Sequence, residues 1–141
     1  MIQRSILRLL DANANRSLEG VRVCEEIIRF HWDHSALFRR LRALRHEIAA
    51  TIRQLPATPA ELAKARDTRA DVGRQAPSSS VTSLEHLLVI NLQRGKESLR
   101  TLEECARAIA PRHAASFQRL RFRLYEIERA ILLQLATLRH P

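Results

Sequence analysis

Glycine and aromatic residues are scarce in this sequence. Its 141 residues include three glycines, and aromatic residues make up 4%. An all-β fold is nearly excluded, because sandwiches and barrels need turn glycines and aromatic strand residues. No run of about 18 apolar residues occurs, so we expect no membrane span and no membrane partner. Charged residues follow the N-terminus too soon for a secretory signal, and we therefore expect a cytoplasmic protein.

Lysine is also scarce, although the chain is strongly basic. Lys64 and Lys96 are two of the 24 basic residues, the rest are arginine, and the formal net charge is +9. Arginine presents a planar, permanently charged group that suits phosphates and carboxylates. Genome composition, phosphate ligands and nucleic acid all stay open as reasons for this excess. Cys24 and Cys105 lack the spacing of a redox or zinc site, and we expect both to be reduced, structural thiols.

Apolar residues recur every three or four positions, which predicts an all-α fold. The breakers between these segments predict long helices over about residues 2–30, 35–54, 82–109 and 113–138, and a short helix over 59–66. Thr58 with Glu61, and Thr82 with Glu85, have the spacing of capping boxes. Residues 67–81 contain glycine, proline and three serines, and we expect them to form a loop.

The first and third long helices carry the same polar motif, 78 residues apart. The matching pairs are Asn13 and Asn91, Arg16 and Arg94, Glu19 and Glu97, Arg22 and Arg100, Glu25 and Glu103, and Glu26 and Glu104. A second match, from Phe38 to Phe117, has an offset of 79 and predicts one inserted residue in the second turn. We therefore predict one domain, a four-helix bundle built from a duplicated helical hairpin about a pseudo-twofold axis. The copies cover about residues 2–54 and 82–138, and residues 55–81 connect them.

The repeated motif places an amide inside each apolar face. On a helical wheel, Asn13 and Asn91 fall within the apolar arcs, and an unpartnered buried amide costs about 1–3 kcal/mol. We expect both to be hydrogen-bonded, and a structural and a ligand-binding role stay open. One helical turn in each copy offers guanidinium groups beside carboxylates, a combination that suits a phosphate next to Mg²⁺. Candidate phosphate ligands are Asn13, Arg16, Arg22, Asn91, Arg94 and Arg100, and candidate metal ligands are Glu25, Glu26, Glu103 and Glu104. Glu19 and Glu97 are expected to be solvated or to form a dimer contact.

Several common active-site motifs are missing. The sequence contains no Walker loop, no Gly-x-Gly-x-x-Gly and no Glu-x-x-His, which argues against the usual nucleotide-binding loops and against a di-iron bundle. His31 and His34 have a spacing that metal sites use, but they flank Trp32 in an expected surface turn.

Taken together, these motifs resemble a family of small helical domains that is often fused ahead of thiamine-phosphate synthase and also occurs as stand-alone proteins. The resemblance runs from about residue 6 to 128 and rests on residues 11–30, 44–46, 66–73, 91–104 and 120–126. The family is known as a non-ribokinase type of hydroxymethylpyrimidine phosphate kinase. Glu26 and Ile90 depart from it, since aspartate and alanine are expected there.

The resemblance implies a transferase of thiamine biosynthesis. It would use ATP and Mg²⁺ to convert hydroxymethylpyrimidine monophosphate to the diphosphate, and would not phosphorylate the free alcohol. The resemblance adds Arg45 and Thr68 to the expected substrate-binding residues. Without the synthase barrel, the chain is not expected to be a thiamine-phosphate synthase, although that enzyme is an expected functional partner. A non-catalytic module that binds such an enzyme or nucleic acid stays the alternative, and a homodimer stays open.

The segment 66–73 has no counterpart in the second half. A duplicated bundle is symmetric, whereas a phosphoryl donor and acceptor differ, so this loop is the best candidate to break the symmetry. We expect Arg66, Asp67 and Asp71 to be catalytic, with the loop folded near the Arg22/Glu25 or the Arg100/Glu103 turn. A solvated linker is the alternative.

Overall fold

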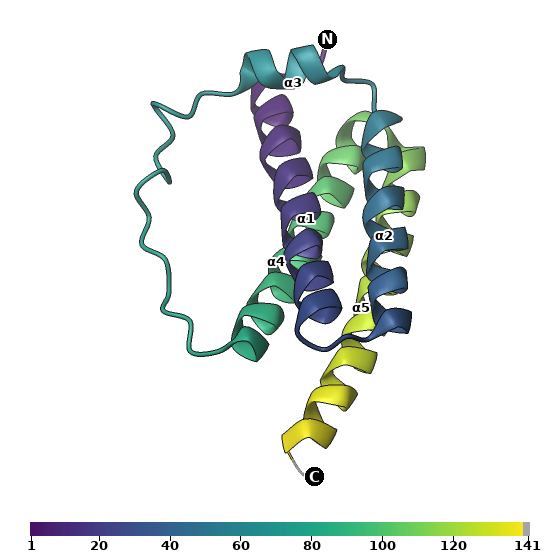
Figure 1. Cartoon of the computed structure of the whole chain (residues 1–141). Helices are drawn as coiled ribbons and strands as arrows, with labels where there is room; N and C mark the ends of the chain where they lie inside the picture. Colours follow the sequence, from purple (N-terminus) through teal and green to yellow (C-terminus); the bar gives the residue numbers. More distant parts are fainter. Residues whose placement is uncertain (140–141) are drawn as a thin grey trace.

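The computed structural model describes residues 1–139, and every regular element within them is helical (Figure 1). The helices are α1 (Arg4–Phe30), α2 (Ser35–Arg53), α3 (Pro59–Ala65), α4 (Leu84–Ile109) and α5 (Pro111–Arg139). The predicted all-α class is confirmed, and each predicted helix is present with ends shifted by at most two residues. Within the same residues, no helix combines the length and apolarity needed to cross a bilayer.

The four long helices pack around one apolar core. Helix α1 contacts α2 and α4, α5 contacts α4 and α2, and the short α3 packs against α1 (Figure 1). The largest fully buried side chains come from all four long helices: Leu10, Ile28, Leu41, Leu44, Ile48, Leu88, Leu92, Leu99, Leu102, Phe117, Leu124 and Ile131. Most of the stability of such helices comes from burying this apolar face rather than from helix propensity.

The central α1–α4 crossing depends on small residues. A Cβ on Gly20 would lie 3.2 Å from the carbonyl oxygen of Asn91 and 3.5 Å from the amide nitrogen of Gly95. The Cys24 thiol meets the Leu88 carbonyl at 3.7 Å, while Gly20 lies against Asn91 and Gly95. Since contacts move back along α4 as they advance along α1, the two helices run antiparallel.

Two helix starts follow local side-chain chemistry. Thr58 Oγ1 accepts from the Glu61 amide at 3.1 Å, and Glu61 Oε1 accepts from the Thr58 amide at 3.0 Å, which confirms the predicted capping box. The prediction of a Thr82 cap is wrong. Ser83 is the N-cap of α4, and its Oγ accepts from the His86 amide at 3.0 Å, because the extended backbone ends at Ser83.

The two long-helix turns differ in length. His31 to His34 separate α1 from α2, whereas Ala110 alone separates α4 from α5. The predicted insertion in the second turn is therefore wrong, since this turn is the shorter one. As predicted, His31 and His34 lie in a turn, where His34 Nδ1 accepts from the Leu37 amide at 3.1 Å and caps α2. The superposition of the two hairpins about an axis stays a prediction.

Candidate functional site

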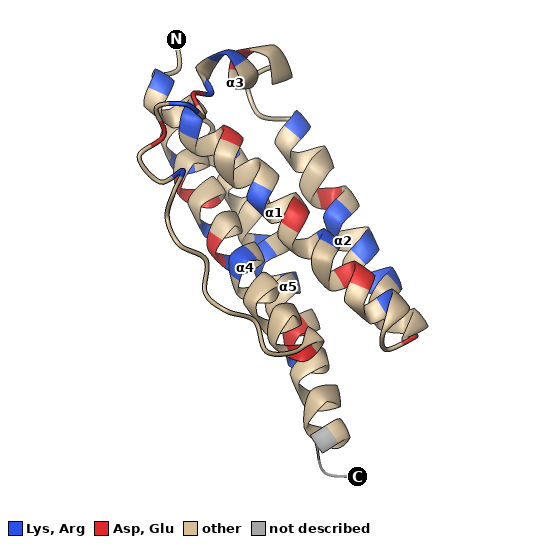
Figure 2. Cartoon of the chain, turned by 60° about the vertical axis from the view of Figure 1, so that its left-hand side comes forward, with Lys and Arg blue, Asp and Glu red and all other residues tan. Residues whose placement is uncertain are grey.

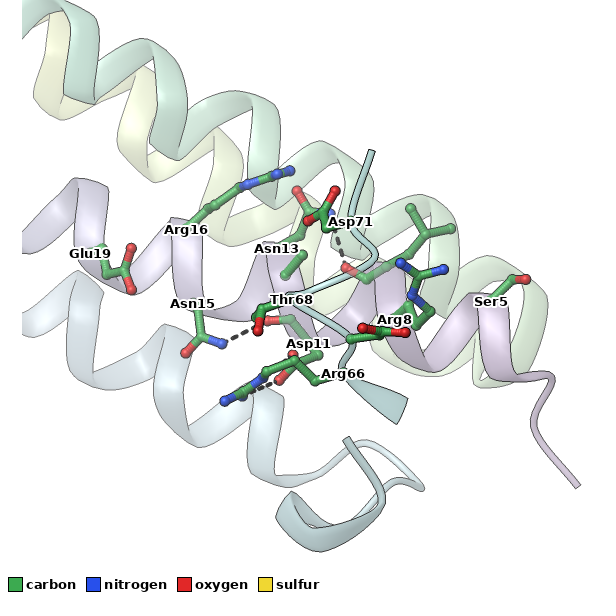
Figure 3. Close-up of a pocket in the computed structure, with 13 residues that line it drawn as sticks. Ser5, Arg8, Asp11, Asn13, Asn15, Arg16, Glu19, Arg66, Thr68 and Asp71 are labelled. Atoms are coloured by element: carbon green, nitrogen blue, oxygen red, sulfur yellow. Dashed lines mark hydrogen bonds and ion pairs between the residues drawn. The ribbon is translucent and has the colours of Figure 1, made fainter. Parts of the chain in front are cut away.

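The segment after α3 lies over the N-terminal half of α1 and borders an open cavity of about 750 Å³ (Figure 3). Helix α1 supplies one wall and residues 66–71 supply the other. The lining residues are Ser5, Arg8, Leu9, Asp11, Ala12, Asn13, Asn15, Arg16, Glu19, Arg66, Asp67, Thr68 and Asp71. Six of the residues singled out in the sequence therefore meet here, namely Asn13, Arg16, Arg66, Asp67, Thr68 and Asp71.

A two-pronged ion pair attaches this segment to α1. Arg66 Nε and Nη2 donate to the two carboxylate oxygens of Asp11, each at 2.7 Å. Asp11 is 7% exposed and has little contact with water, so its carboxylate depends on the Arg66 guanidinium for hydrogen bonds. The hydrogen bond to Asp11 raises the pKa of Arg66 above its ordinary value. Because the two residues are 55 positions apart, the pair fixes the loop against the helix.

The two loop aspartates shape the segment they belong to. Asp67 Oδ1 accepts from the Ala70 amide at 3.0 Å, and Asp71 Oδ1 accepts from the Gly73 amide at 2.8 Å. Such bonds from an aspartate to a backbone amide two or three residues later are typical of tight turns. Each aspartate uses one oxygen in this way, and its other oxygen has no hydrogen-bond partner among residues 1–139.

Two exposed arginines on α1 line the cavity without a protein partner among the described residues. Arg8 and Arg16 form neither a hydrogen bond nor an ion pair with any residue that the structure describes. They therefore differ from Arg66, which is held by Asp11. Free guanidinium groups in a cavity are suited to bind phosphate oxygens, often through two parallel hydrogen bonds.

A second cavity, of about 860 Å³, lies along the groove between α1 and α4. It is lined by Asn13, Arg16, Glu19, Val89, Ile90, Gln93, Arg94, Glu97, Ser98 and Thr101. Asn13, Arg16 and Glu19 line both cavities, so the two spaces adjoin along α1. Arg94, another sequence candidate, lies in this groove and not in the loop cavity.

The buried amides behave as the sequence predicts. Asn13 and Asn91 are each 5% exposed, and each Nδ2 donates to the carbonyl four residues earlier, Leu9 and Leu87, at 2.9 Å. Asn91 lines neither cavity, whereas Asn13 lines both. The two amides thus form the same kind of local hydrogen bond. Of the two, Asn13 is the one that lines the cavities.

The candidate metal ligands Glu25 and Glu103 are buried in cross-helix ion pairs. Arg45 donates to Glu25 through Nε at 2.5 Å and Nη2 at 3.1 Å, and Arg121 donates to Glu103 at 3.0 and 3.4 Å. These bonds raise the pKa of both arginines. The expected substrate ligand Arg45 is thus held by Glu25, and the carboxylates are satisfied without a metal.

The exposed candidates on the same turns are also paired. Arg22 contacts Glu26 at 3.0 Å, and Arg100 contacts Glu104 at 3.2 Å, in each case one helical turn apart. None of these four residues lines the loop cavity or the groove. Throughout residues 1–139, no three His, Cys, Asp or Glu side chains group as metal ligands. A metal role for Glu25, Glu26, Glu103 and Glu104 stays a prediction.

The position of the loop differs from the expectation. Segment 66–71 lies beside residues 5–19 of α1, and the cavity that it forms includes neither the Arg22/Glu25 nor the Arg100/Glu103 turn. The reason is the Arg66–Asp11 pair, which fixes the loop near the start of α1. Arg8, Asp11 and Asn15 were not among the candidate site residues predicted from the sequence. They share one face of α1 at three- and four-residue spacing, and this polar face was the available signal.

This geometry defines a helical bundle with a cavity lined by arginines and carboxylates. The chain belongs to the ThiD2 family, whose sequence profile matches residues 8–130. It is similar to the thiamine-phosphate synthases of Rhodopirellula baltica (35% identical over 138 residues, 96% of this chain), Synechocystis sp. (38%, 91%) and Gloeobacter violaceus (36%, 89%). The chain spans 36% of the length of each of these relatives. The name of these relatives connects the family with thiamine biosynthesis. No solved structure matches the chain.

Proposed function

We propose that this chain is a phosphotransferase that transfers the γ-phosphoryl group of ATP to hydroxymethylpyrimidine monophosphate and forms the diphosphate. The observation that carries the proposal is the loop cavity, in which the unpaired Arg8 and Arg16 face a segment bearing Asp67, Thr68 and Asp71. Phosphoryl transfer depends mainly on positioning and charge neutralisation, and this cavity offers groups for both. Family membership and the name of the relatives support the substrate class.

The chemistry requires little of the protein beyond binding. An oxygen of the acceptor's phosphate attacks the γ-phosphorus of ATP, the bond from that phosphorus to the β,γ-bridging oxygen breaks, and ADP leaves with the electron pair. A phosphate monoester has a second pKa of about 6, so the attacking oxygen is already deprotonated at neutral pH. The reaction needs no general base, and the roles of Asp67 and Asp71 are to position groups or to bind a cation.

The arginines account for a preference for the phosphorylated acceptor. With hydroxymethylpyrimidine monophosphate bound, Arg8 and Arg16 would each face phosphate oxygens. The free alcohol would lack the phosphate oxygens that these guanidinium groups bind, and it would therefore bind more weakly. Arg66 donates to Asp11 through Nε and Nη2, so its Nη1 can still donate to a phosphate. Thr68 adds a hydroxyl group to the same wall.

The free oxygens of Asp67 and Asp71 fit a Mg²⁺ ion that arrives with the nucleotide. Mg²⁺ is commonly held by one or two carboxylates together with substrate phosphates and waters, so a dedicated cage of protein ligands is not needed. The ion would neutralise charge that develops on the phosphate oxygens. Asp67 and Asp71 can take this role without losing their turn bonds, since each has one oxygen left.

A second candidate function is a non-catalytic module that binds a thiamine-biosynthesis enzyme. The observation that favours it is the length of the relatives, in which the matching part is 36% of a longer chain. Nucleic acid is the weaker partner, because basic and acidic residues intermix along the helices instead of forming one basic stripe (Figure 2). A thiamine-phosphate synthase stays a proposed functional partner in either case.

The test is an assay of purified protein with ATP and Mg²⁺. We expect ADP and pyrimidine diphosphate from hydroxymethylpyrimidine monophosphate, and little or no product from the free alcohol. If the protein forms no product but binds a thiamine-phosphate synthase in a pull-down of the two purified proteins, the binding module is favoured. Salt-sensitive binding to random DNA without turnover would favour the nucleic-acid alternative.

A further inference from the structure

The two cavities meet at a single guanidinium. Arg16 lines both the loop cavity and the α1–α4 groove, whereas Arg8 and Arg66 line only the former and Arg94 only the latter. Among the residues that the structure describes, the guanidinium groups of Arg16 and Arg94 have no ion-pair or hydrogen-bond partner. Two adjoining spaces joined at one free arginine are the arrangement that a transfer between two phosphorylated ligands needs.

The groove is suited to the larger of two such ligands. From Val89 to Thr101 it follows α4 for about 18 Å, at 1.5 Å per residue. Val89, which is 38% exposed, and Ile90 form an apolar wall at one end, where a base could pack. Arg94 and Arg16 follow towards the loop cavity, and their charges suit a chain of phosphates.

One acidic residue of the groove, Glu19, fits a sugar, whereas Glu97 lies one turn beyond Arg94, on the side of the phosphates. Glu19 and Glu97 line the groove on opposite helices, and Gln93 Nε2 donates to Glu97 Oε1 at 2.8 Å. The Glu19 carboxylate would accept hydrogen bonds from ribose hydroxyls, as an acidic residue does in dinucleotide-binding folds. In the loop cavity, Leu9 is the large apolar side chain, and Arg8, Thr68 and Asp71 accompany it, which suits a smaller ring bearing one phosphate.

We infer that the α1–α4 groove is the nucleotide-donor site, with the base against Val89 and Ile90, and that the loop cavity holds the phosphorylated acceptor. Arg16, at the junction, contacts the phosphoryl group that moves. This assignment rests on the proposed function. It also identifies what makes the two repeats unequal: Arg94 binds the donor, whereas its counterpart Arg16 faces both ligands.

The test separates the two sites by direct binding and by kinetics. Calorimetric titration with ADP, without acceptor, is compared for the wild type, Arg94→Ala, Arg8→Ala and a control, Arg119→Ala, which removes an exposed arginine on α5. We expect Arg94→Ala to weaken ADP binding by at least about 10-fold, the usual effect of losing a charge-assisted hydrogen bond. Arg8→Ala and Arg119→Ala should leave it within about 2-fold, and Arg8→Ala should instead raise the KM for the acceptor.

The assignment and the proposed function fail in different ways. If the wild type turns over but Arg8→Ala weakens ADP binding and Arg94→Ala does not, the donor assignment is overturned and the kinase stands. If the wild type binds ADP with the Arg94 dependence but transfers no phosphoryl group, the nucleotide site stands and the proposed function fails. Absence of ADP binding overturns the assignment outright. Arg8, Arg94 and Arg119 are all exposed, so we expect the three variants to fold. Circular dichroism checks their helical content.

Discussion

Arg66 and Asp11 join the connecting loop to α1 through two 2.7 Å hydrogen bonds that span 55 residues of sequence. Asp11 belongs to the buried surface of the bundle, and Arg66 opens the segment that carries Asp67, Thr68 and Asp71. The pair therefore links the helical bundle to the segment that lines the loop cavity.

Loss of this pair should release the loop. We expect Asp11→Ala to speed tryptic cleavage after Arg69 and Arg74, both exposed, and to lower kcat/KM by at least about 10-fold, because the cavity wall is no longer held. Mass spectrometry of the digests identifies the cleaved bonds. The control is Asp33→Asn, which removes an exposed carboxylate in the α1–α2 turn and keeps a side chain suited to the positive φ of 49° there; it should leave both the cleavage rate and kcat/KM unchanged. Equal protection of the loop in both variants would contradict a holding role for Asp11.

The loop aspartates can be tested without disturbing the backbone. Asparagine keeps an oxygen that can accept from the Ala70 or Gly73 amide, so Asp67→Asn and Asp71→Asn remove charge and leave the turns intact. We expect kcat to fall by at least about 100-fold if these carboxylates bind the cation or position the phosphates. The free energy of unfolding should change by less than about 0.5 kcal/mol. If both variants keep the wild-type kcat/KM and melting curve, the loop aspartates have no catalytic role and the active-site residues belong to the helices.

The buried glutamates should contribute mainly to stability. Glu25 is 3% exposed and bound by Arg45, so Glu25→Gln leaves a largely buried guanidinium without its charged partner. Urea denaturation should show a loss of about 3 kcal/mol in the free energy of unfolding. Glu26→Gln, at the next position in an exposed pair with Arg22, should cost less than about 1 kcal/mol. If Glu25→Gln keeps full stability but lowers the affinity for Mg²⁺, Glu25 is a metal ligand and not a structural residue.

The α1–α4 crossing gives a matched pair of glycine substitutions. Gly20→Ala places a Cβ against the backbone of Asn91 and Gly95, which cannot move without separating the helices. We expect it to lower the free energy of unfolding by about 1 kcal/mol or more, even after the gain in helix propensity. Gly95→Ala meets the end of the flexible Leu124 side chain and should stay within about 0.5 kcal/mol of the wild type. Chemical denaturation of both variants measures the difference, and equal losses would refute the close-crossing explanation.

Local patterns sufficed to predict the helices but not the pairing between them. The periodicity of α1 and the capping box of Thr58 and Glu61 depend on neighbours a few residues away, and both are confirmed. The partner of Glu25 depends on the register between α1 and α2, which the wheel cannot supply. The sequence repeat aligned Phe38 with Phe117 and therefore Arg42 with Arg121. In the structure the equivalent of Arg121, which pairs with Glu103, is Arg45, which pairs with Glu25. The alignment failed because the second turn is shorter than the first.

The candidate site was predicted in part for a similar reason. The loop residues Asp67, Thr68 and Asp71 stood out because nothing in the second half repeats them, and they do line a cavity. Their position over α1 follows from the Arg66–Asp11 contact, which no sequence spacing reveals. Arg22 and Arg100 were equally strong candidates in the sequence, but each forms an ion pair with a glutamate one helical turn away.

Phosphorus NMR of one reaction tests the central claim most directly. Purified chain is incubated with ATP, Mg²⁺ and either hydroxymethylpyrimidine monophosphate or the free alcohol, and the spectra are followed with time. We expect the monophosphate signal to be replaced by the two coupled signals of a diphosphate ester, with ADP formed in equal amount, and no new ester from the alcohol. A monophosphate that persists unchanged beside intact ATP, or equal rates with both acceptors, would contradict this function.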